Sequence, residues 1–261
     1  MSARVSAIAG LAVAALVLGF AASAVADEAL DKGFEALKTY DWGDDRGPLT
    51  AIDDAVVASH DDAEARKALE TRLAEVLKTD APRAAKDYVC RKLSLIGGEG
   101  CVPTVAGLLT DEKLSHMARY ALERIPCDCA VDAMRDAMGK VKGKLKIGMI
   151  NSLGVRRDAE ATGALVALLG DSDQAIAAAA AAALGKIGSP EAAKALTSFE
   201  AKAPAALKLP AADALLACAE QLLADGKKAD AMRIYTSLAK SEIKHVKLAA
   251  TRGMLAATGK K

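Results

Sequence analysis

The chain has 261 residues, with 35 basic and 34 acidic side chains that give a net charge of +1 at pH 7. This balance provides no overall electrostatic attraction to nucleic acid or to an anionic membrane surface. Aromatic residues make up 3% of the chain, which disfavours proteins that stack nucleobases or sugars on exposed rings. We therefore expect no nucleic-acid partner.

Residues 1–26 are predicted to be a secretory signal peptide. Arg4 precedes an apolar stretch at 7–20, and the small residues at 24–26 suit cleavage before Asp27. The apolar stretch, about 14 residues, is shorter than the ~20 that a membrane-spanning helix needs, and no second run of that length follows. We expect no membrane span and a secreted or periplasmic protein.

Residues 27–80 are predicted to form a helical cap ahead of the repeats, because their apolar residues recur at helical spacing. A turn at 41–48 with two glycines and a proline interrupts this pattern. We interpret Trp42, in this turn, as a cover over the open end of the hydrophobic core that a solenoid must protect. The alternative is that Trp42 binds a partner.

Residues 81–200 contain a sequence repeat with a constant offset of 31 residues. Four columns define it: Leu114, Leu145 and Ile176; Ala118, Met149 and Ala180; Ala121, Ser152 and Ala183; and Leu122, Leu153 and Leu184. A fixed period of about two short helices is typical of a helical solenoid, in which each repeat packs only on its neighbours. The columns lie on the second helix of each repeat.

Local signals set the predicted helix boundaries of the clearest repeat. Asp158 is placed to cap its first helix, and residues 170–173 turn the chain into a second helix at 176–187. The run Gly188-Ser189-Pro190 then supplies a stop, an N-cap and a first-turn proline for the next helix. Eight of the nine residues at 175–183 are alanine, which suits a helix in the crowded middle of a stack.

Residues 201–261 are predicted to continue the stack with C-terminal helix pairs. Pro204 and Pro210 bracket a looser connection in this prediction, and helices follow at 211–223, 229–238 and 246–257. No segment shows the sustained alternation of apolar and polar residues that marks a strand. The sequence therefore predicts no sheet.

These residues resemble HEAT-like repeats of the short variety that is also found in phycobilin lyases. The run at 182–188 closes one repeat, Pro190-Glu191-Ala192 opens the next, and 108–111 and 168–171 are matching turns between helices. The mature chain is similar to the exported HEAT-repeat proteins predicted in planctomycete-type bacteria, whose role is unassigned. The resemblance implies an all-α fold, a right-handed α-solenoid of antiparallel helix pairs.

We expect no enzyme, no cofactor and no metal site. Deoxyhypusine hydroxylase resembles this fold but holds iron with His-Glu dipeptides, whereas His60, His116 and His245 precede Asp61, Met117 and Val246. No histidine has a cysteine or a second histidine at metal-ligand spacing. No nucleophile-elbow motif or glycine-rich phosphate loop occurs either.

Five cysteines are an odd number for an exported chain, so at least one is free or pairs between molecules. Cys101 falls in the loop that enters one repeat, and Cys127 and Cys129 fall in the equivalent loop of the next repeat. A disulfide from Cys101 to Cys127 or Cys129 is therefore plausible. The alternative is that all five are small buried hydrophobic residues or exposed thiols, and Cys218 is expected to be buried.

The sequence favours a non-enzymatic protein-binding scaffold or adaptor in the cell envelope or outside the cell. The alternatives are an accessory subunit or module of a secreted enzyme, or a self-assembling architectural envelope protein. The protein partner is unknown. Because second helices usually line the concave face of HEAT-like stacks, we expect exposed positions there to bind it: Ser115, His116, Arg119, Glu123, Lys146, Ile150 and Asn151.

Four lysines at positions 140, 142, 144 and 146 lie close together between two predicted helices. Such a patch could dock an acidic partner or phosphate, or could be a hydrated loop.

Overall fold

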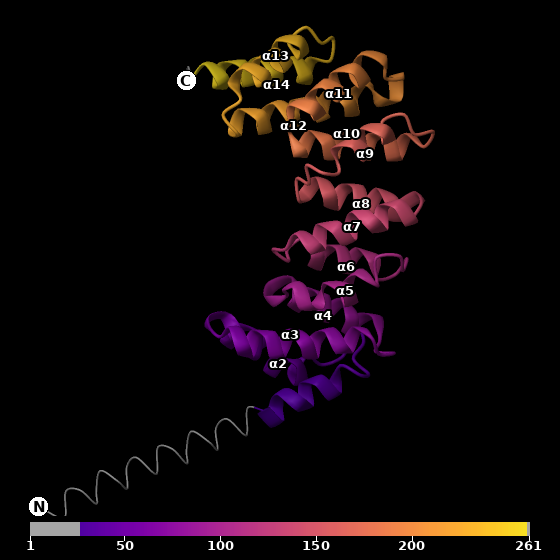
Figure 1. The fold of residues 1–261 in the computed structure, drawn as a ribbon, viewed down its shortest axis with the longest axis vertical. Helices are drawn as coiled ribbons and strands as arrows, with labels where there is room; N and C mark the ends of the chain where they lie inside the picture. Colours follow the sequence, from indigo (N-terminus) through magenta and orange to yellow (C-terminus); the bar gives the residue numbers. More distant parts are fainter. Residues whose placement is uncertain (1–26, 260–261) are drawn as a thin grey trace, which may run out of the picture. The chain divides into compact units, whose positions relative to one another are not determined.

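The computed structural model describes residues 27–259, so the predicted leader lies outside the described residues. Over the described part the chain forms helices and contains no strand, as the sequence predicts (Figure 1). It divides into two compact units, of which one ends at Thr104 and the other begins at Val105. This boundary lies inside the short helix α5, Val102–Ala106.

The first unit is built on a helix at 27–36 and on three longer helical segments. They are η1 (Gly47–Leu49) with α2 (Thr50–Ala58), η2 (Ser59–Asp61) with α3 (Ala63–Leu77), and α4 (Arg83–Ile96) with η3 (Glu99–Cys101). Leu37, Leu49, Leu73 and Leu93 are fully buried in its core. Asp62 caps α3, because its carboxylate accepts hydrogen bonds from two backbone N–H groups of the first turn.

A polar cluster fastens α4 to α2 in this unit. The Tyr88 hydroxyl donates to Asp53 Oδ1 over 2.7 Å, and Lys92 Nζ lies 2.5 Å from the same oxygen. Burial raises the pKa of Asp53, but the hydrogen bonds from Lys92 and Tyr88 outweigh it and leave the pKa below its ordinary value. The carboxylate therefore stays charged at neutral pH and holds the two helices together.

Trp42 does not cover the hydrophobic core, so this interpretation is wrong. Its side chain is 61% exposed, and the guanidinium of Arg83 lies 5.3 Å from the centre of its ring. The turn that carries Trp42 is held by hydrogen bonds among its own residues, such as that from Asp41 N to Asp44 Oδ2. The ring therefore points away from the core.

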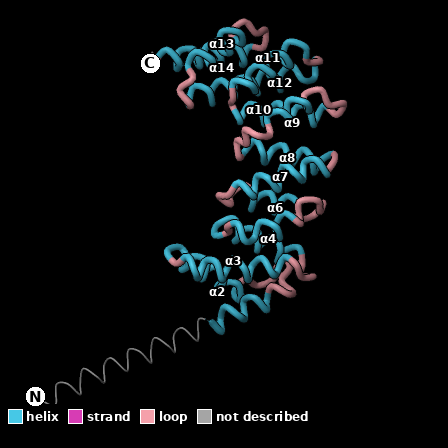
Figure 2. Tube along the Cα trace, in the orientation of Figure 1, coloured by secondary structure: helices cyan, strands magenta, loops and turns pink. Residues whose placement is uncertain are grey.

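The second unit is a stack of helix pairs joined by short loops (Figure 2). After α6 (Ser115–Leu122), the first helices of the pairs are α7 (Asp128–Lys140), α9 (Thr162–Leu168), α11 (Pro190–Lys202) and α13 (Lys228–Leu238). The second helices are α8 (Gly143–Val155), α10 (Gln174–Ile187), α12 (Ala205–Ala224) and α14 (Lys244–Thr258). The predicted α-solenoid is confirmed.

The strongest local signals are confirmed at the boundary between α10 and α11. Gly188 ends α10 in the left-handed conformation, with φ of 66°. Glycine has no Cβ, so this conformation causes no steric clash. Ser189 caps α11 by accepting a hydrogen bond from Ala192 N over 3.0 Å, and Pro190 takes the first helical position.

Two predicted boundaries are wrong. Asp158 is not the N-cap of α9, because the helix begins only at Thr162, and its carboxylate pairs instead with Arg135 of α7 at 2.9 Å. Pro210 does not interrupt the helix, because α12 includes it. Leu207 and Ala211, on one face of α12, pack with Ala177 of α10, and this burial offsets the hydrogen bond that proline cannot make.

The second helices pack so closely that even a Cβ would not fit at two glycines between them. A Cβ on Gly154 of α8 would lie 2.8 Å from the Cα of Ala183 in α10. A Cβ on Gly185 of α10 would lie 2.5 Å from the carbonyl oxygen of Ala214 in α12. The alanine-rich run therefore serves the close approach of backbones, as the sequence suggests.

Candidate functional site

Two of the residues predicted to bind a partner are buried, which corrects the prediction. Ser115 is 1% exposed and Ile150 is fully buried. A second helix in the middle of a stack contacts its own first helix and the second helices on both sides, so only a narrow strip stays exposed. The prediction of seven binding residues assumed that only one stripe of each second helix is buried, but the buried face is wider than one stripe.

Arg119 and Glu123 are half-buried and join α6 to α8. Arg119 Nη1 donates to the carbonyl oxygen of Gly148 over 3.3 Å and to Ser152 Oγ over 3.2 Å. The Ser152 hydroxyl donates in turn to Glu123 Oε1 over 2.6 Å. Burial lowers the pKa of Arg119, and the charge of Glu123 opposes this effect. These contacts engage both side chains within the stack, so they are poor candidates for partner contacts.

Three of the predicted residues remain available at the surface. His116 and Asn151 are exposed, and Lys146 is half-exposed. His116 lies on α6, while Lys146 and Asn151 lie on α8. They form a sparse polar strip on the second helices.

Two neighbouring hollows of the second unit are lined mainly by first helices and the loops that follow them. One of about 320 Å³ lies between α11 and α13. We call it the α11–α13 groove, and its lining residues are Pro190, Ala193, Lys194, Thr197, Glu200, Leu215, Asp230, Arg233, Ile234 and Ser237. A second hollow of about 470 Å³ shares Glu200 and Ser237 with it and continues to Ile243. The two hollows therefore adjoin.

The α11–α13 groove has an apolar floor and a charged rim. Leu215 of α12 and Ile234 of α13 are buried beneath it. Its rim carries charges of both signs, and Asp230 and Arg233 form an ion pair there. A polypeptide segment with apolar and charged side chains suits such a surface better than a phosphate group, which would need an excess of positive charge.

The sequence did not predict this groove, because the partner site was expected on the second helices. A signal was present in the first helix, where the small residues Ala193 and Thr197 are four positions apart and share a face of α11. Close packing in the row of second helices leaves room between the first helices, and small side chains do not fill it.

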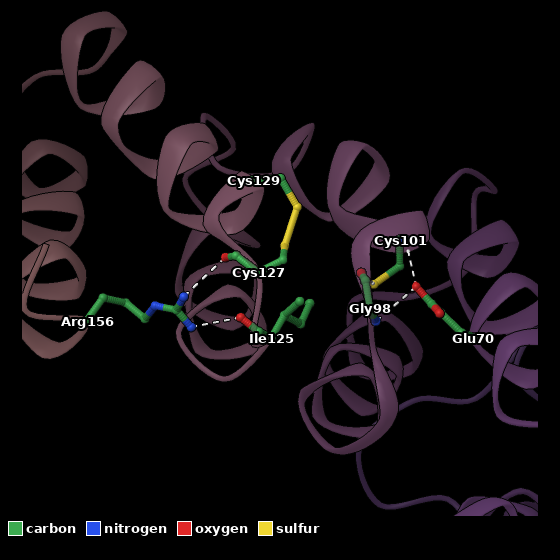
Figure 3. The surroundings of a disulfide bond; sticks show 7 residues. All are labelled: Glu70, Gly98, Cys101, Ile125, Cys127, Cys129 and Arg156. Atoms are coloured by element: carbon green, nitrogen blue, oxygen red, sulfur yellow. Dashed lines mark hydrogen bonds between the residues drawn. A yellow bond between two sulfur atoms is a disulfide. The ribbon is translucent and has the colours of Figure 1, made fainter. Parts of the chain in front are cut away.

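The predicted disulfide is wrong in its pairing. Cys127 bonds to Cys129, with their Cα atoms 5.3 Å apart, and Cys101 is a buried free thiol (Figure 3). Cys127 is the extended residue before α7, and such a residue folds its side chain back over the first helical turn. That turn contains Cys129, which explains the pairing.

Cys101 is held within the first unit by a buried carboxylate. Glu70 Oε1 accepts hydrogen bonds from Cys101 N over 2.8 Å and from Gly98 N over 3.0 Å (Figure 3). The Cys101 thiol donates to the carbonyl oxygen of Gly98 over 3.4 Å. Glu70 therefore satisfies the backbone of η3, which is a structural role.

No group of three or more histidine, cysteine, aspartate or glutamate side chains among residues 27–259 could hold a metal ion. Within the same range, no helix combines the length and apolarity needed to cross a membrane.

The family described as HEAT repeats matches residues 131–216, which span α7 to α12. The chain is similar to the crystal structure of an engineered protein, with 22% identity over 80% of this chain and 96% of that one and a TM-score of 0.38. It is also similar to human deoxyhypusine hydroxylase in complex with glycerol, with 15% identity over 76% of this chain and 98% of that one and a TM-score of 0.41. No curated protein matches the chain. The family match over residues 131–216 supports a HEAT-like repeat protein, and the stacked helix pairs form an α-solenoid.

Proposed function

We propose that this chain is a protein-binding scaffold or adaptor, not an enzyme, that works in the cell envelope or outside the cell. Its second unit binds a polypeptide segment of a partner in the α11–α13 groove. HEAT repeats commonly mediate protein interactions, which supports the general role. The extracytoplasmic setting is supported by the predicted signal peptide at 1–26.

The observation that carries the proposal is the α11–α13 groove, which a second hollow adjoins. Leu215 and Ile234 offer an apolar floor, while Lys194 and Glu200 offer opposite charges on one wall. Apolar burial provides most of the affinity at such a site, and rim charges select the partner. The second-helix strip, with His116, Lys146 and Asn151, offers charged and polar groups.

The test is to fill the groove without altering the stack. Thr197 lines the groove, and its hydroxyl donates to the backbone carbonyl four residues earlier over 2.8 Å. Thr236 is an equally exposed helical threonine with the same internal hydrogen bond at 2.8 Å, but it is not among the lining residues. The two positions therefore form a matched pair.

A partner is first recovered with the wild-type chain from the native envelope fraction and identified by mass spectrometry. Its affinity is then measured for Thr197→Trp and for Thr236→Trp. We expect Thr197→Trp to weaken binding at least about tenfold, as blocking a central pocket does, and Thr236→Trp to leave it unchanged. Equal affinity of both variants for the partner would place the binding site elsewhere.

Self-assembly is a second candidate function because of exposed leucines on α14. Leu248 is 50% exposed and Leu255 is 53% exposed, and their spacing of seven places them on one face of the helix. Concentration-dependent sedimentation of the wild type and of a Leu248→Lys, Leu255→Lys variant separates this function from groove binding. Association that only the wild type shows would support it, and a monomeric wild type would dismiss it.

A further inference from the structure

The five cysteines fall into two classes with different chemistry. Cys90, Cys101 and Cys218 are buried free thiols, and burial raises their pKa to about 12, about 12 and about 11. Because the thiolate is the reactive form, these three are inert at neutral pH. Cys127 and Cys129 are half-buried and form the one disulfide among the described residues.

This disulfide encloses too little chain to be explained as a structural brace. A disulfide stabilises a fold mainly by restricting the unfolded chain, and the effect grows with the number of residues enclosed. Here the two cysteines are separated by Asp128 alone. The first turn of α7 already fixes these residues through the hydrogen bonds of a 13-residue helix.

The pair lies at the N-terminus of α7, a position that stabilises the thiolate released by an exchange reaction. Cys127 is the N-cap of α7 and Cys129 lies in its first turn, where backbone N–H groups lack helical acceptors and the helix dipole is positive. Arg156 donates to the carbonyl oxygens of Ile125 over 2.7 Å and of Cys127 over 3.1 Å, which fixes a positive charge beside the N-cap (Figure 3). The charge of Asp128 opposes this effect, but Asp128 is exposed to solvent.

We propose that Cys127–Cys129 is a thiol–disulfide exchange site that oxidises dithiols in other polypeptides. This activity goes beyond the proposed binding function and does not depend on the groove. A substrate thiolate attacks one sulfur of the pair, the Cys127–Cys129 bond breaks, and the other cysteine leaves as a thiolate. The second substrate thiolate then attacks the substrate sulfur of the mixed disulfide, which forms the substrate disulfide, breaks the bond to the chain's cysteine and releases that cysteine as a thiolate. The two cysteine thiolates take up the two protons that the substrate thiols lost, so two electrons and two protons have passed from the dithiol to the pair.

Each chain accepts electrons from one dithiol, so the reaction is stoichiometric. The step needs no reactant besides the dithiol. The attacked sulfur decides which cysteine leaves, and the N-cap position and Arg156 favour departure of Cys127 as the thiolate.

The test uses the oxidised full chain and a synthetic peptide with two cysteines separated by several residues. After acid quenching and alkylation, mass spectrometry counts oxidised peptide and newly alkylated cysteines. We expect one peptide oxidised per chain, without denaturant, with the new alkylation confined to Cys127 and Cys129. A Cys127→Ser, Cys129→Ser variant is expected to oxidise no peptide, and Cys218→Ser is expected to react like the wild type.

Single variants identify the reactive sulfur. With Cys129→Ser the lone Cys127 thiol is expected to be alkylated about tenfold faster than the lone Cys129 thiol in Cys127→Ser, because the helix N-terminus and Arg156 stabilise the Cys127 thiolate. Should the wild-type pair remain oxidised until denaturant is added, or should the double-serine variant oxidise the peptide equally, the proposal is overturned. The wild-type result alone decides the matter if the double variant does not fold.

Discussion

Gly185 offers the sharpest test of the close packing between second helices. Substitution by alanine places a Cβ 2.5 Å from the carbonyl oxygen of Ala214 and 3.1 Å from its Cα, and both are backbone atoms that cannot rotate away. Helices α10 and α12 must therefore move apart. Overpacking of this kind costs about 3 kcal/mol at the upper end of its usual range. Alanine regains about 1 kcal/mol through its better helix propensity, which leaves a net loss of about 2 kcal/mol.

Gly163→Ala is the matched control, because Gly163 lies in helix α9 and a Cβ there meets no atom within 4 Å. We expect this variant to gain up to about 1 kcal/mol from helix propensity alone. The assay is urea unfolding followed by circular dichroism. With a slope of about 2 kcal/mol per molar urea, Gly185→Ala is expected to lower the midpoint by about 1 M. A midpoint at or above that of the wild type would refute the packing argument, as would an equal loss in Gly163→Ala.

Two further predictions concern α10 and the polar cluster of the first unit. Ala183→Leu is expected to cost about 1–3 kcal/mol of unfolding free energy, because Ala183 is buried against Gly154, while Ala182→Leu on the exposed face of α10 is expected to change it by less than about 0.5 kcal/mol. Equal urea midpoints for these two variants would contradict the assigned orientation of α10. The pKa of Asp53 is lower in the folded state than in the unfolded chain, where it is about 3.9. The charged form therefore stabilises the fold at neutral pH, and this contribution is lost as the pH falls through the folded pKa. Asp53→Asn is expected to be less stable than the wild type at pH 7, and the difference is expected to shrink as the pH falls below the unfolded pKa of about 3.9. A difference that stays constant as the solution is acidified, measured by thermal unfolding, would count against this prediction.

The sequence predicts those parts of the fold that depend on local chemistry. The stop, cap and proline at residues 188–190 act through hydrogen bonds and backbone angles of neighbouring residues, so they are readable without the tertiary structure. The 31-residue columns likewise identify the second helices, because burial of one helix face imposes a regular spacing.

The features that the sequence does not predict depend on distances between helices. Ile150 is buried because α8 has neighbours on several sides, and no single-helix pattern reveals how wide the buried arc is. Pro210 stays inside α12 because Leu207 and Ala211 pack against another helix. The α11–α13 groove lies between two first helices that contact each other less than α10 contacts α8 and α12, and only the assembled stack determines this difference.

The disulfide shows the same limit in a different form. The position in adjacent repeats predicted a bridge from Cys101 to Cys127 or Cys129, whereas the extended backbone of Cys127 ahead of α7 brings it to Cys129 instead. The sequence does predict that Cys218 is buried, because its helical face is apolar.

Site-specific photocrosslinking in the native host tests the central claim most directly, because it reports which surface touches a partner. A photoreactive side chain is placed at Thr197 in the groove, at Thr236 beside it, and at His116 and Asn151 on the second-helix strip. The account predicts that one partner protein crosslinks at Thr197 and not at the other three positions. Crosslinks confined to His116 or Asn151, or an absence of any crosslink at Thr197, would contradict it.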